Sequence, residues 1–327
     1  MILCVAASPS IDKLFEVDRV EVGRIHRPSA FVAVPGGKGL NVARSAHVLG
    51  ADVVATGVLA GHAGRWVEEA LAAEGVRARF AWVEGETRSS LSVADSTGRG
   101  LTEFYETGPD VGEGWARLEA IVADLLPQAG WLTISGSLPP GAPEDGYARL
   151  VRAARAADVP AALDTRDEPL ALGVSAGPDL VKVNAEEAGA LLGSPIEMLD
   201  DAVGAAAEIR GRLGGDGHAA IVTRGAEGAA VVTPQGETLV ARLYERGRYP
   251  VGSGDAFLGG LVTALERGEG WRSALALALG AAAANAMVPG AGRLDPARAA
   301  ELARRAEVRP VAFGGRARRP RPSPPRT

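Results

Sequence analysis

Short runs of apolar and β-branched residues alternate with amphipathic stretches of helical period along most of the chain. The apolar runs predict core strands at residues 2–6, 53–58, 130–134, 160–164, 179–183, 219–223 and 229–233. Apolar positions spaced three and four apart predict helices at residues 39–49, 64–74, 114–126, 143–157, 185–192, 199–213, 255–267, 271–286 and 295–305. Strands that alternate with helices are typical of an α/β fold, in which helices cover both faces of a mostly parallel sheet.

Two segments interrupt this alternation, because residues 14–34 and 88–106 show strand-like patterns with no helix between the strands. They predict a small second sheet that would suit a lid or a dimer surface. We therefore expect one domain over residues 1–313, with a β lid from about residues 12–35 and 88–106. The remaining residues, 314–327, are rich in Pro and Arg and are expected to be a disordered tail.

The composition and the net charge exclude several classes of function. The 327 residues are 46% hydrophobic and 23% charged, which is enough apolar material for a substantial core. A net charge of −5 gives no general electrostatic footprint for nucleic acid or an anionic membrane, so neither is expected as a partner. The first residues carry no basic residue and too short an apolar run for a signal peptide, which predicts a cytoplasmic protein.

Cysteine and lysine are scarce. The single cysteine, Cys4, rules out a disulfide within the chain, and the four histidines show no metal-ligand spacing. The only lysines are Lys13, Lys38 and Lys182, and arginine supplies the other basic residues. Each lysine is therefore a candidate for a specific role.

The strongest local motif is Val-Gly-Ser-Gly-Asp at residues 251–255, directly before a predicted helix. Glycines at a helix start expose N–H groups at the positive end of its dipole, where a phosphate oxygen can bind. Asp255 would stand at this anion hole and could accept a proton from a hydroxyl that attacks phosphorus. The alternative is a tight turn in which Asp255 caps the helix.

A second glycine cluster, residues 36–39, opens the helix that carries Asn41. Glycines let a ligand approach the backbone, Lys38 can meet an anion, and Asn41 can bond hydroxyls, a combination that suits a phosphorylated sugar. The alternative is a flexible turn with a solvated lysine. Asp12, just past the first strand, could accept bonds from two adjacent sugar hydroxyls or be an ordinary turn residue.

Three further segments follow predicted strands. Lys182, Asn184 and Glu187 could form a nucleotide and magnesium site, although Asn-x-x-Glu at a helix start is also the pattern of a capping box. Residues 223–228 could wrap nucleotide phosphates or form a hairpin turn. Residues 135–141 end a strand where open α/β sheets bind ligands, or form a plain loop.

Taken together, these segments resemble the ribokinase-like carbohydrate kinases, in particular the branch of 1-phosphofructokinase, tagatose-6-phosphate kinase and the minor bacterial 6-phosphofructokinase. The matching segments are SPSID (8–12), GGKGLNVA (36–43), TRSSL (87–91), ISGSLPPG (134–141), LVKVNAEE (180–187), TRGAEG (223–228) and VGSGDAFLGG (251–260). The resemblance covers residues 1–305 and implies a Rossmann-like core, a β lid that often also dimerises, and phosphoryl transfer from ATP with Mg²⁺.

The resemblance also implies a role for each matching residue. Asp255 would be the catalytic base, and Gly252, Ser253, Gly254 and Asp255 would form the anion hole. The sugar hydroxyls would be held by Asp12, Gly36, Gly37 and Asn41. The phosphate already on the substrate would meet Lys38, Arg88 and Ser137, with Arg24 as a helper from the lid. ATP would be held by Lys182, Asn184, Thr223, Gly225 and Gly228, and Glu187 would serve Mg²⁺.

This sequence departs from the family pattern at three positions. Val183 stands where relatives often have Pro, Ser8 replaces a frequent Asn, and Tyr249 replaces a small polar residue just before the anion hole. The leading hypothesis is a kinase that converts fructose 1-phosphate to fructose 1,6-bisphosphate, as a homodimer joined through the lid. The alternatives are a tagatose-6-phosphate or fructose-6-phosphate kinase, a kinase of an unphosphorylated sugar or nucleoside, and a catalytically silent binding protein.

Overall fold

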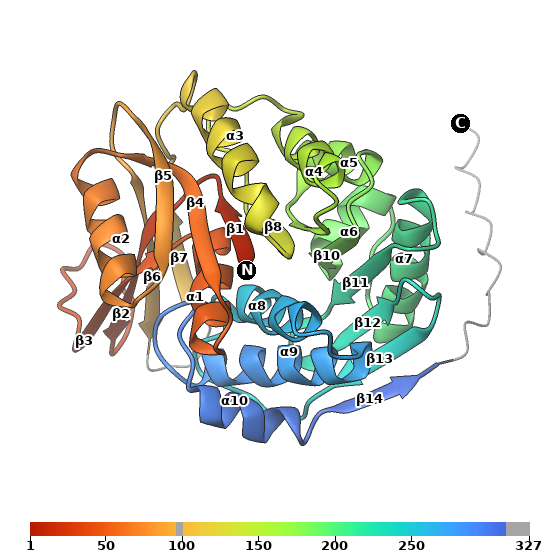
Figure 1. The fold of residues 1–327 in the computed structure, drawn as a ribbon. Coiled ribbons are helices and arrows are strands. Elements are labelled where there is room, and N and C mark those ends of the chain that lie inside the picture. Colours follow the sequence, from red (N-terminus) through yellow and green to blue (C-terminus); the bar gives the residue numbers. More distant parts are fainter. Residues whose placement is uncertain (96–100, 312–327) are drawn as a thin grey trace, which may run out of the picture.

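A ten-stranded sheet forms the centre of the protein (Figure 1). The computed structural model describes residues 1–95 and 101–311. Its strands lie in the order β14 (Glu307–Pro310), β13 (Thr238–Arg242), β12 (Ala229–Val232), β11 (Ala219–Thr223), β10 (Leu180–Asn184), β9 (Ala161–Asp164), β8 (Trp131–Ser135), β1 (Ile2–Ala6), β4 (Val53–Ala60) and β5 (Arg77–Val83). Neighbours from β11 to β5 pair in parallel, whereas β12, β13 and β14 add antiparallel pairs at one end.

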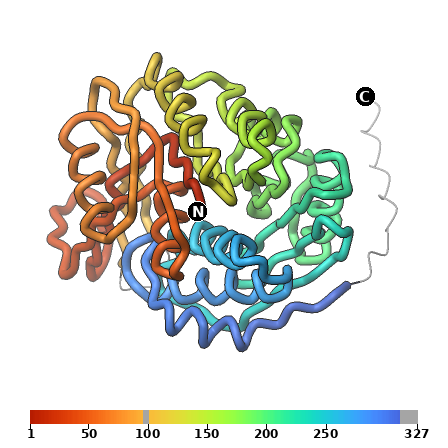
Figure 2. The backbone as a smooth tube through the Cα atoms, in the orientation of Figure 1, coloured from red at the N-terminus to blue at the C-terminus, as the bar shows by residue number. Residues whose placement is uncertain are grey.

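Helices cover both faces of this sheet, as the backbone trace in Figure 2 also shows. One face packs against α1 (Lys38–Val48), α2 (Gly61–Ala73), α8 (Ser253–Glu266), α9 (Trp271–Ala286) and α10 (Pro296–Ala303). The other packs against α3 (Gly114–Leu125), α4 (Gly146–Ala156), α5 (Asp167–Ser175), α6 (Ala185–Leu192) and α7 (Leu199–Arg212). Two short 3₁₀ turns, η1 (Leu126–Gln128) and η2 (Gly225–Glu227), complete the order. The α/β fold predicted from the sequence is confirmed.

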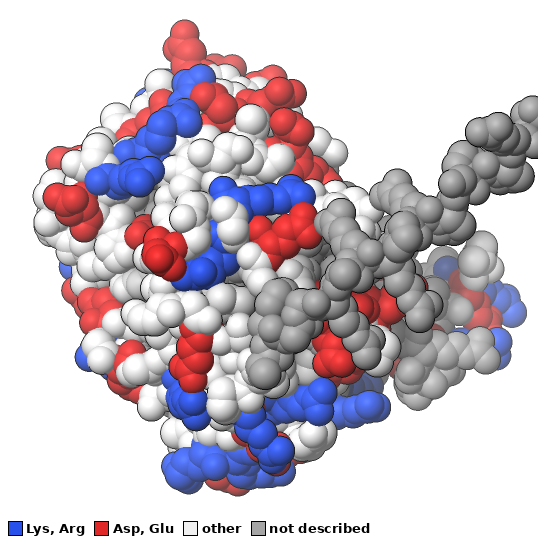
Figure 3. All heavy atoms as spheres, turned by 90° about the vertical axis from the view of Figure 1, so that its right-hand side faces the viewer, with Lys and Arg blue, Asp and Glu red and all other residues white. Residues whose placement is uncertain are grey.

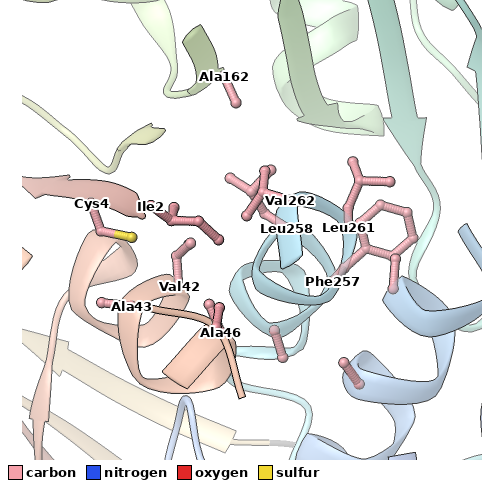
Figure 4. Packing of buried hydrophobic residues seen from close by; sticks show 14 of the residues in the cluster. Ile2, Cys4, Val42, Ala43, Ala46, Ala162, Phe257, Leu258, Leu261 and Val262 are labelled. Atoms are coloured by element: carbon pink, nitrogen blue, oxygen red, sulfur yellow. The ribbon is translucent and has the colours of Figure 1, made fainter. Parts of the chain in front are cut away.

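Close packing of α1 and α8 brings their first turns to the same end of the sheet. Figure 4 shows Ile2 and Cys4 of β1 in the same apolar cluster as Val42 of α1 and Leu258 of α8. Gly259 allows the two helices to approach, because a Cβ atom there would lie 2.9 Å from the Val42 carbonyl oxygen. Burial raises the pKa of Cys4 to about 12, so its thiol is neutral and acts as a small apolar side chain in this core.

The second, smaller sheet has the order β3 (Ala30–Gly36), β2 (Ser10–Val17), β6 (Arg88–Asp95) and β7 (Leu101–Tyr105). The central pair, β2 and β6, is parallel, and the outer pairs are antiparallel. Because side chains alternate along a strand, even-numbered residues of β2 and β6 share one face and odd-numbered residues share the other. The sheet predicted for these segments is therefore confirmed, while its role as a lid stays a prediction.

Every predicted core strand and helix is present, with each boundary within three residues of its expected position. The pattern missed β5, β13, β14 and α5. The edge strands β5 and β14 contain charged residues, and β13, next to β14, is only five residues long. Helix α5 is short and contains Pro169, so neither period is clear in the sequence. Residues 96–100, within the predicted lid, and the predicted tail, residues 314–327, lie outside the described residues.

The surface carries both signs of charge. Figure 3 shows Lys and Arg interspersed with Asp and Glu over the visible part of one side of the molecule. Within residues 1–95 and 101–311, no helix has the length and apolar character needed to cross a membrane.

Candidate active site

A cavity of about 1200 Å³ lies between the carboxyl ends of the parallel strands and the small sheet. It is lined by most of the residues predicted from the sequence: Asp12, Gly37, Lys38, Asn41, Arg88, Ser137, Lys182, Asn184, Glu187, Thr223, Gly225, Gly228, Gly252, Ser253, Gly254 and Asp255. Two predicted residues do not line it. Gly36 lies behind Asp12. A Cβ atom at position 36 would not fit, because it would lie 2.0 Å from the Asp12 Cγ. Arg24 lies on the exposed β2–β3 loop, 3.7 Å from the Glu21 carboxylate.

Asp255 is the third residue of α8, not its cap. Gly252 caps the helix with a φ of 81°, and no side chain caps it. The Asp255 carboxylate instead accepts a hydrogen bond of 2.9 Å from the Asn41 Nδ2. Burial, reinforced by the negative charge of Asp164, raises its pKa from 3.8 to about 7, although Lys38 and Lys182 oppose the shift. The geometry therefore contradicts the helix-cap alternative.

The α8 N-terminus exposes a smaller set of donors than the motif suggested. The Ser253 N–H already donates to the Pro250 carbonyl oxygen at 3.1 Å. The N–H groups of Gly252, Gly254 and Asp255 have no hydrogen-bond acceptor in the described part of the chain, and they face the cavity with the helix dipole behind them. These three N–H groups are available to an anion.

Beside Asp255, a buried carboxylate holds two lysines. Asp164 ends β9 and is fully buried, and it accepts hydrogen bonds from Lys182 at 2.5 Å and from Lys38 at 3.0 Å. Burial favours its neutral form, but the two ammonium groups outweigh burial and hold its pKa below the ordinary value. Lys38 also reaches Glu187 at 2.9 Å. Burial alone would lower the Lys38 pKa, but the negative charges of Asp164 and Glu187 outweigh burial and raise the pKa above its ordinary value. This lysine therefore stays charged.

Sequence reasoning missed Asp164. The signal available was a lone carboxylate at the carboxyl end of a predicted buried strand, where ligands bind in parallel sheets. The face of the sheet on which the Asp164 side chain lies depends on the register of β9. In that register, Asp164 pairs with Ser135 of β8. The pattern of apolar residues did not fix that register.

Arg88 and Asp12 lie on the small sheet and form a separate end of the cavity. Arg88 donates to the Ser8 Oγ at 3.1 Å and to the Ser90 Oγ at 2.9 Å. Asp12 accepts from the Ser10 Oγ at 2.6 Å and from the Gly37 N–H at 3.3 Å, and burial raises its pKa. The titratable neighbours of Arg88 are Asp12, Tyr105 and Glu106, whereas those of Lys38 are Asp164, Glu187 and Asp255. The two cations that we assigned to one phosphate therefore have different surroundings.

The Asn184–Glu187 pair forms the capping box, and its role at a nucleotide and magnesium site stays a prediction. The Asn184 Oδ1 accepts from the Glu187 N–H, and the Glu187 Oε2 accepts from the Asn184 N–H, each at 2.8 Å, which is a complete capping box. The second oxygen, Oε1, bonds Lys38, and Glu187 lines the cavity. Glu187 is thus a helix cap whose free lone pairs face the candidate site.

The loops at 223–228 and 135–141 both contribute residues to the cavity lining. Residues 225–227 form the η2 turn between the antiparallel strands β11 and β12, and Gly225 and Gly228 both have positive φ. At Gly228 a Cβ atom would lie 2.2 Å from the Ala241 carbonyl oxygen, so only glycine fits. Ser137 lies on a plain loop, and its carbonyl oxygen accepts from the buried Tyr147 hydroxyl at 3.3 Å.

The far end of the cavity is apolar. Its lining there is formed by Leu243, Phe257, Leu279, Ala282, Ala283 and Ala286. Small alanine side chains on α9 leave the space open, and Leu243 and Phe257 supply apolar surface. A flat apolar group such as a purine base is the kind of ligand that this lining favours.

Comparison with known proteins agrees with this geometry. The model of the pfkB family of carbohydrate kinases matches residues 5–298. The chain belongs to this family. It is 34% identical over 302 residues to a 1-phosphofructokinase of Haloferax volcanii, an overlap of 90% of this chain and 93% of that protein. It is accordingly a phosphotransferase with a hydroxyl acceptor.

Two solved structures show the same fold over nearly the whole chain. The crystal structure of a possible 1-phosphofructokinase from Thermotoga maritima has a TM-score of 0.86 at 25% identity, covering 95% of this chain and 99% of that one. The tetrameric inhibited form of phosphofructokinase-2 from Escherichia coli has a TM-score of 0.84 at 25% identity, covering 93% and 98%. The predicted membership of the ribokinase-like carbohydrate kinases is confirmed.

Proposed function

We propose that this kinase transfers the γ-phosphoryl group of ATP to a hydroxyl of fructose 1-phosphate, giving fructose 1,6-bisphosphate and ADP. The observation that carries the proposal is the Asp255 carboxyl, which has a pKa raised to about 7 and stands beside unpartnered N–H groups at the α8 N-terminus. Such a pair can take a proton from an alcohol and stabilise charge on a transferring phosphoryl group. The 1-phosphofructokinase name of the Haloferax relative supports the choice of sugar.

At the sugar end, Arg88 is suited to the phosphate already on the substrate, because its guanidinium can make paired, charge-assisted bonds. Asp12 is suited to hydroxyls. The Asn41 Oδ1 is buried without a hydrogen-bond partner among the described residues, so a substrate hydroxyl would satisfy it. Asn41 also holds Asp255, and this shared contact would align the attacking hydroxyl with its base.

The transfer itself needs few residues. As the hydroxyl oxygen bonds to phosphorus, its proton passes to Asp255 and the bond between the γ-phosphorus and the bridging oxygen breaks, releasing ADP. The N–H groups of Gly252, Gly254 and Asp255 bind the phosphoryl oxygens. Lys38, which lies among Asp164, Glu187 and Asp255, is placed for this moving group, in contrast to its predicted role at the resident phosphate.

At the nucleotide end, we assign the apolar lining of α9 to the adenine base and the 223–228 loop, Lys182 and Asn184 to the ATP phosphates. Lys182 is almost fully buried, and its contact with Asp164 fixes its ammonium near Gly254, where a Cβ atom would lie 3.1 Å from the Lys182 Nζ. A side chain at position 254 would displace this ammonium. The glycine thus keeps the lysine next to the anion hole.

Mg²⁺ fits the same region. Within residues 1–95 and 101–311, no group of three His, Cys, Asp or Glu side chains could form a metal cage. Mg²⁺ in phosphoryl-transfer enzymes instead uses one or two carboxylates together with waters and phosphate oxygens. Glu187 lines the cavity and is the carboxylate that we assign to Mg²⁺, whereas Asp164 is fully buried and both of its oxygens are bonded to lysines. When bound there, Mg²⁺ would neutralise charge on the ATP phosphates.

A coupled ADP-release assay tests the function directly. We expect turnover with fructose 1-phosphate to exceed that with tagatose 6-phosphate and fructose 6-phosphate, and fructose and nucleosides to be poor acceptors because they offer nothing to Arg88. Equal turnover of fructose and any hexose phosphate would exclude a sugar-phosphate kinase. No ATP-dependent turnover of any acceptor would leave a silent binding protein on a kinase fold.

We further propose that the chain is a cytoplasmic homodimer joined through the small sheet. The face of this sheet away from the cavity carries an apolar patch: Phe15 and Phe31 pack edge to face at 5.5 Å, and Leu91 pairs with Phe104 across β6 and β7. Phe31 and Phe104 are 59% and 60% exposed, which favours burial against a partner. The expected mass in solution by light scattering is that of a dimer, and Phe31→Glu with Phe104→Glu should give a monomer. The cytoplasm is the compartment that supplies ATP, and cell fractionation tests this placement.

A further inference from the structure

Tyr249, the unusual residue before the anion hole, joins the nucleotide end of the cavity to the small sheet. Its hydroxyl donates to the Glu16 Oε1 on β2 at 2.5 Å. The Arg248 guanidinium lies 5.6 Å from the centre of the Tyr249 ring, and its Nη2 lies 3.7 Å from the Glu16 Oε2. These three side chains, called here the clasp, belong to segments more than two hundred residues apart in the sequence.

One side of the clasp belongs to the segment that lines the nucleotide end. Leu243, Gly247, Pro250 and Val251 line the cavity, whereas Arg248 and Tyr249 do not. The Tyr249 N–H donates to the Ala286 carbonyl oxygen at 2.9 Å, at the end of α9 that borders the apolar lining. The segment then runs directly into the Gly252 cap of α8. A shift of Tyr249 would therefore move both the base end and the anion hole.

The other side of the clasp belongs to the sugar end. Glu16 and Asp12 are four residues apart on β2, so both side chains lie on the same face of the small sheet. On that face Ser10 pairs with Arg88 and Asp12 pairs with Ser90 across the β2–β6 ladder. Tyr249 thus contacts the face that carries the sugar-binding candidates.

We propose that Tyr249 is a positioning residue through which the sugar end and the nucleotide end bind their ligands cooperatively. This inference rests on the proposed function for the identity of the two ligands. Binding of a sugar phosphate restricts the motion of β2 and β6. Through the Tyr249–Glu16 hydrogen bond, this also restricts the motion of residues 244–252. ATP then binds to a segment that is already in position. By linkage, ATP strengthens sugar-phosphate binding by the same factor.

The test is a comparison of the KM for ATP at a low and at a saturating concentration of fructose 1-phosphate. The wild-type KM for ATP should fall as the sugar phosphate saturates. In Tyr249→Phe, this cooperativity factor should shrink by about threefold to tenfold, the loss expected for one charge-assisted hydrogen bond that is partly exposed. Its kcat with both substrates saturating should stay within about twofold of wild type, because Tyr249 does not line the cavity.

Matched variants separate coupling from a general effect. Tyr244→Phe removes a hydroxyl from the same segment, one that is exposed and has no hydrogen-bond partner in the described ranges, and it should keep the wild-type factor. Glu16→Ala should match Tyr249→Phe, the double variant should be no worse than either, and Glu16→Gln, which keeps an acceptor oxygen, should retain most of the coupling. An unchanged factor in Tyr249→Phe, or an equal loss in Tyr244→Phe, overturns the proposal.

Amide hydrogen exchange tests whether the clasp links the two segments, and it does not depend on enzyme turnover. In the unliganded protein, Tyr249→Phe should accelerate exchange in residues 10–17 as well as in residues 244–252. Exchange that changes only near the substitution overturns the inference. If exchange responds in both segments but no sugar phosphate is phosphorylated, the proposed function has failed and the mechanical link remains.

Discussion

Replacement of Asp255 by Asn should make the protein more stable and nearly inactive. The carboxyl deprotonates near 3.8 when exposed and near 7 in the fold, because burial and Asp164 disfavour its charge. A difference of about three pKa units corresponds to as much as about 4 kcal/mol, at 1.36 kcal/mol per unit. Since Asn keeps the size of the side chain and can accept the Asn41 hydrogen bond, the variant loses the charge and little else.

The sign of the pH effect follows from proton binding. Between about pH 4 and pH 7 the native protein binds more protons at Asp255 than the unfolded chain does. The wild-type free energy of unfolding therefore falls as the pH rises from about 4 to about 7. Above about pH 7, Asp255 causes no further decrease in this free energy. The Asn variant lacks this decline, so its advantage over wild type should be largest at pH 8 and absent near pH 4.

Activity should change in the opposite direction. Only ionised Asp255 can accept a proton, so wild-type kcat should rise with pH to a plateau above about pH 7. An Asn side chain cannot take the proton, and kcat should fall by about 10²–10⁴-fold and lose this acidic limb. Binding of ATP and of the sugar phosphate should stay within a few-fold of wild type.

Urea unfolding at pH 5 and pH 8, combined with kcat over the same range, measures both effects. Asp12→Asn is the matched control: it also removes a buried carboxyl with a raised pKa, but it should raise the KM for the sugar phosphate and keep the acidic limb of kcat. The reasoning is refuted if the Asp255 variant retains more than about a tenth of wild-type kcat. It is also refuted if that variant is less stable than wild type at pH 8.

Three further substitutions test the remaining parts of the site. Arg88→Ala should lower kcat/KM for the sugar phosphate by about 10- to 100-fold, mainly through KM, and an equal loss with fructose would remove Arg88 from the phosphate. Glu187→Gln keeps the capping box, so its melting temperature should hardly change while the Mg²⁺ dependence of kcat shifts to higher concentration; an unaltered Mg²⁺ titration would leave a purely structural role. Ala283→Phe fills the apolar end and should raise the KM for ATP by about tenfold or more with little effect on the sugar KM, whereas equal effects on both would argue against a base at that end.

The apolar pattern alone located the strands whose carboxyl ends line the cavity, because buried parallel strands are continuous apolar runs that no polar periodicity obscures. It also placed Asp255 next to a glycine-rich helix start. It could not tell that α8 begins two residues earlier than expected, and this shift moves Asp255 from a cap position into the helix. A shift of two residues therefore separated the structural role from the chemical one.

Side-chain direction was the part that sequence could not supply. Lys38 and Arg88 were both predicted to face one phosphate, but the Lys38 ammonium turns towards Asp164 and Glu187. That choice depends on β9 lying beside β8 and β10, a tertiary arrangement that no local motif encodes. For Glu187, the capping-box pattern in the sequence could not show that only one carboxylate oxygen is needed for the cap, which leaves the other to bond Lys38.

The scarcity of lysine gives this protein a built-in chemical probe. Lys182 is 5% exposed and locked to Asp164, Lys38 is 36% exposed through the cavity, and Lys13 lies on the opposite face of the small sheet, bonded to the Ser89 Oγ. The N-terminal amine is paired with Glu266 and nearly covered. An amine-selective acylating reagent therefore meets two accessible lysine side chains, one inside the cavity and one outside it. Acylation needs the neutral amine, and Asp164 and Glu187 keep Lys38 charged, so Lys38 should react much more slowly than Lys13. A ligand that fills the cavity should slow the labelling of Lys38 further and leave the labelling of Lys13 unchanged, so Lys13 serves as the internal standard.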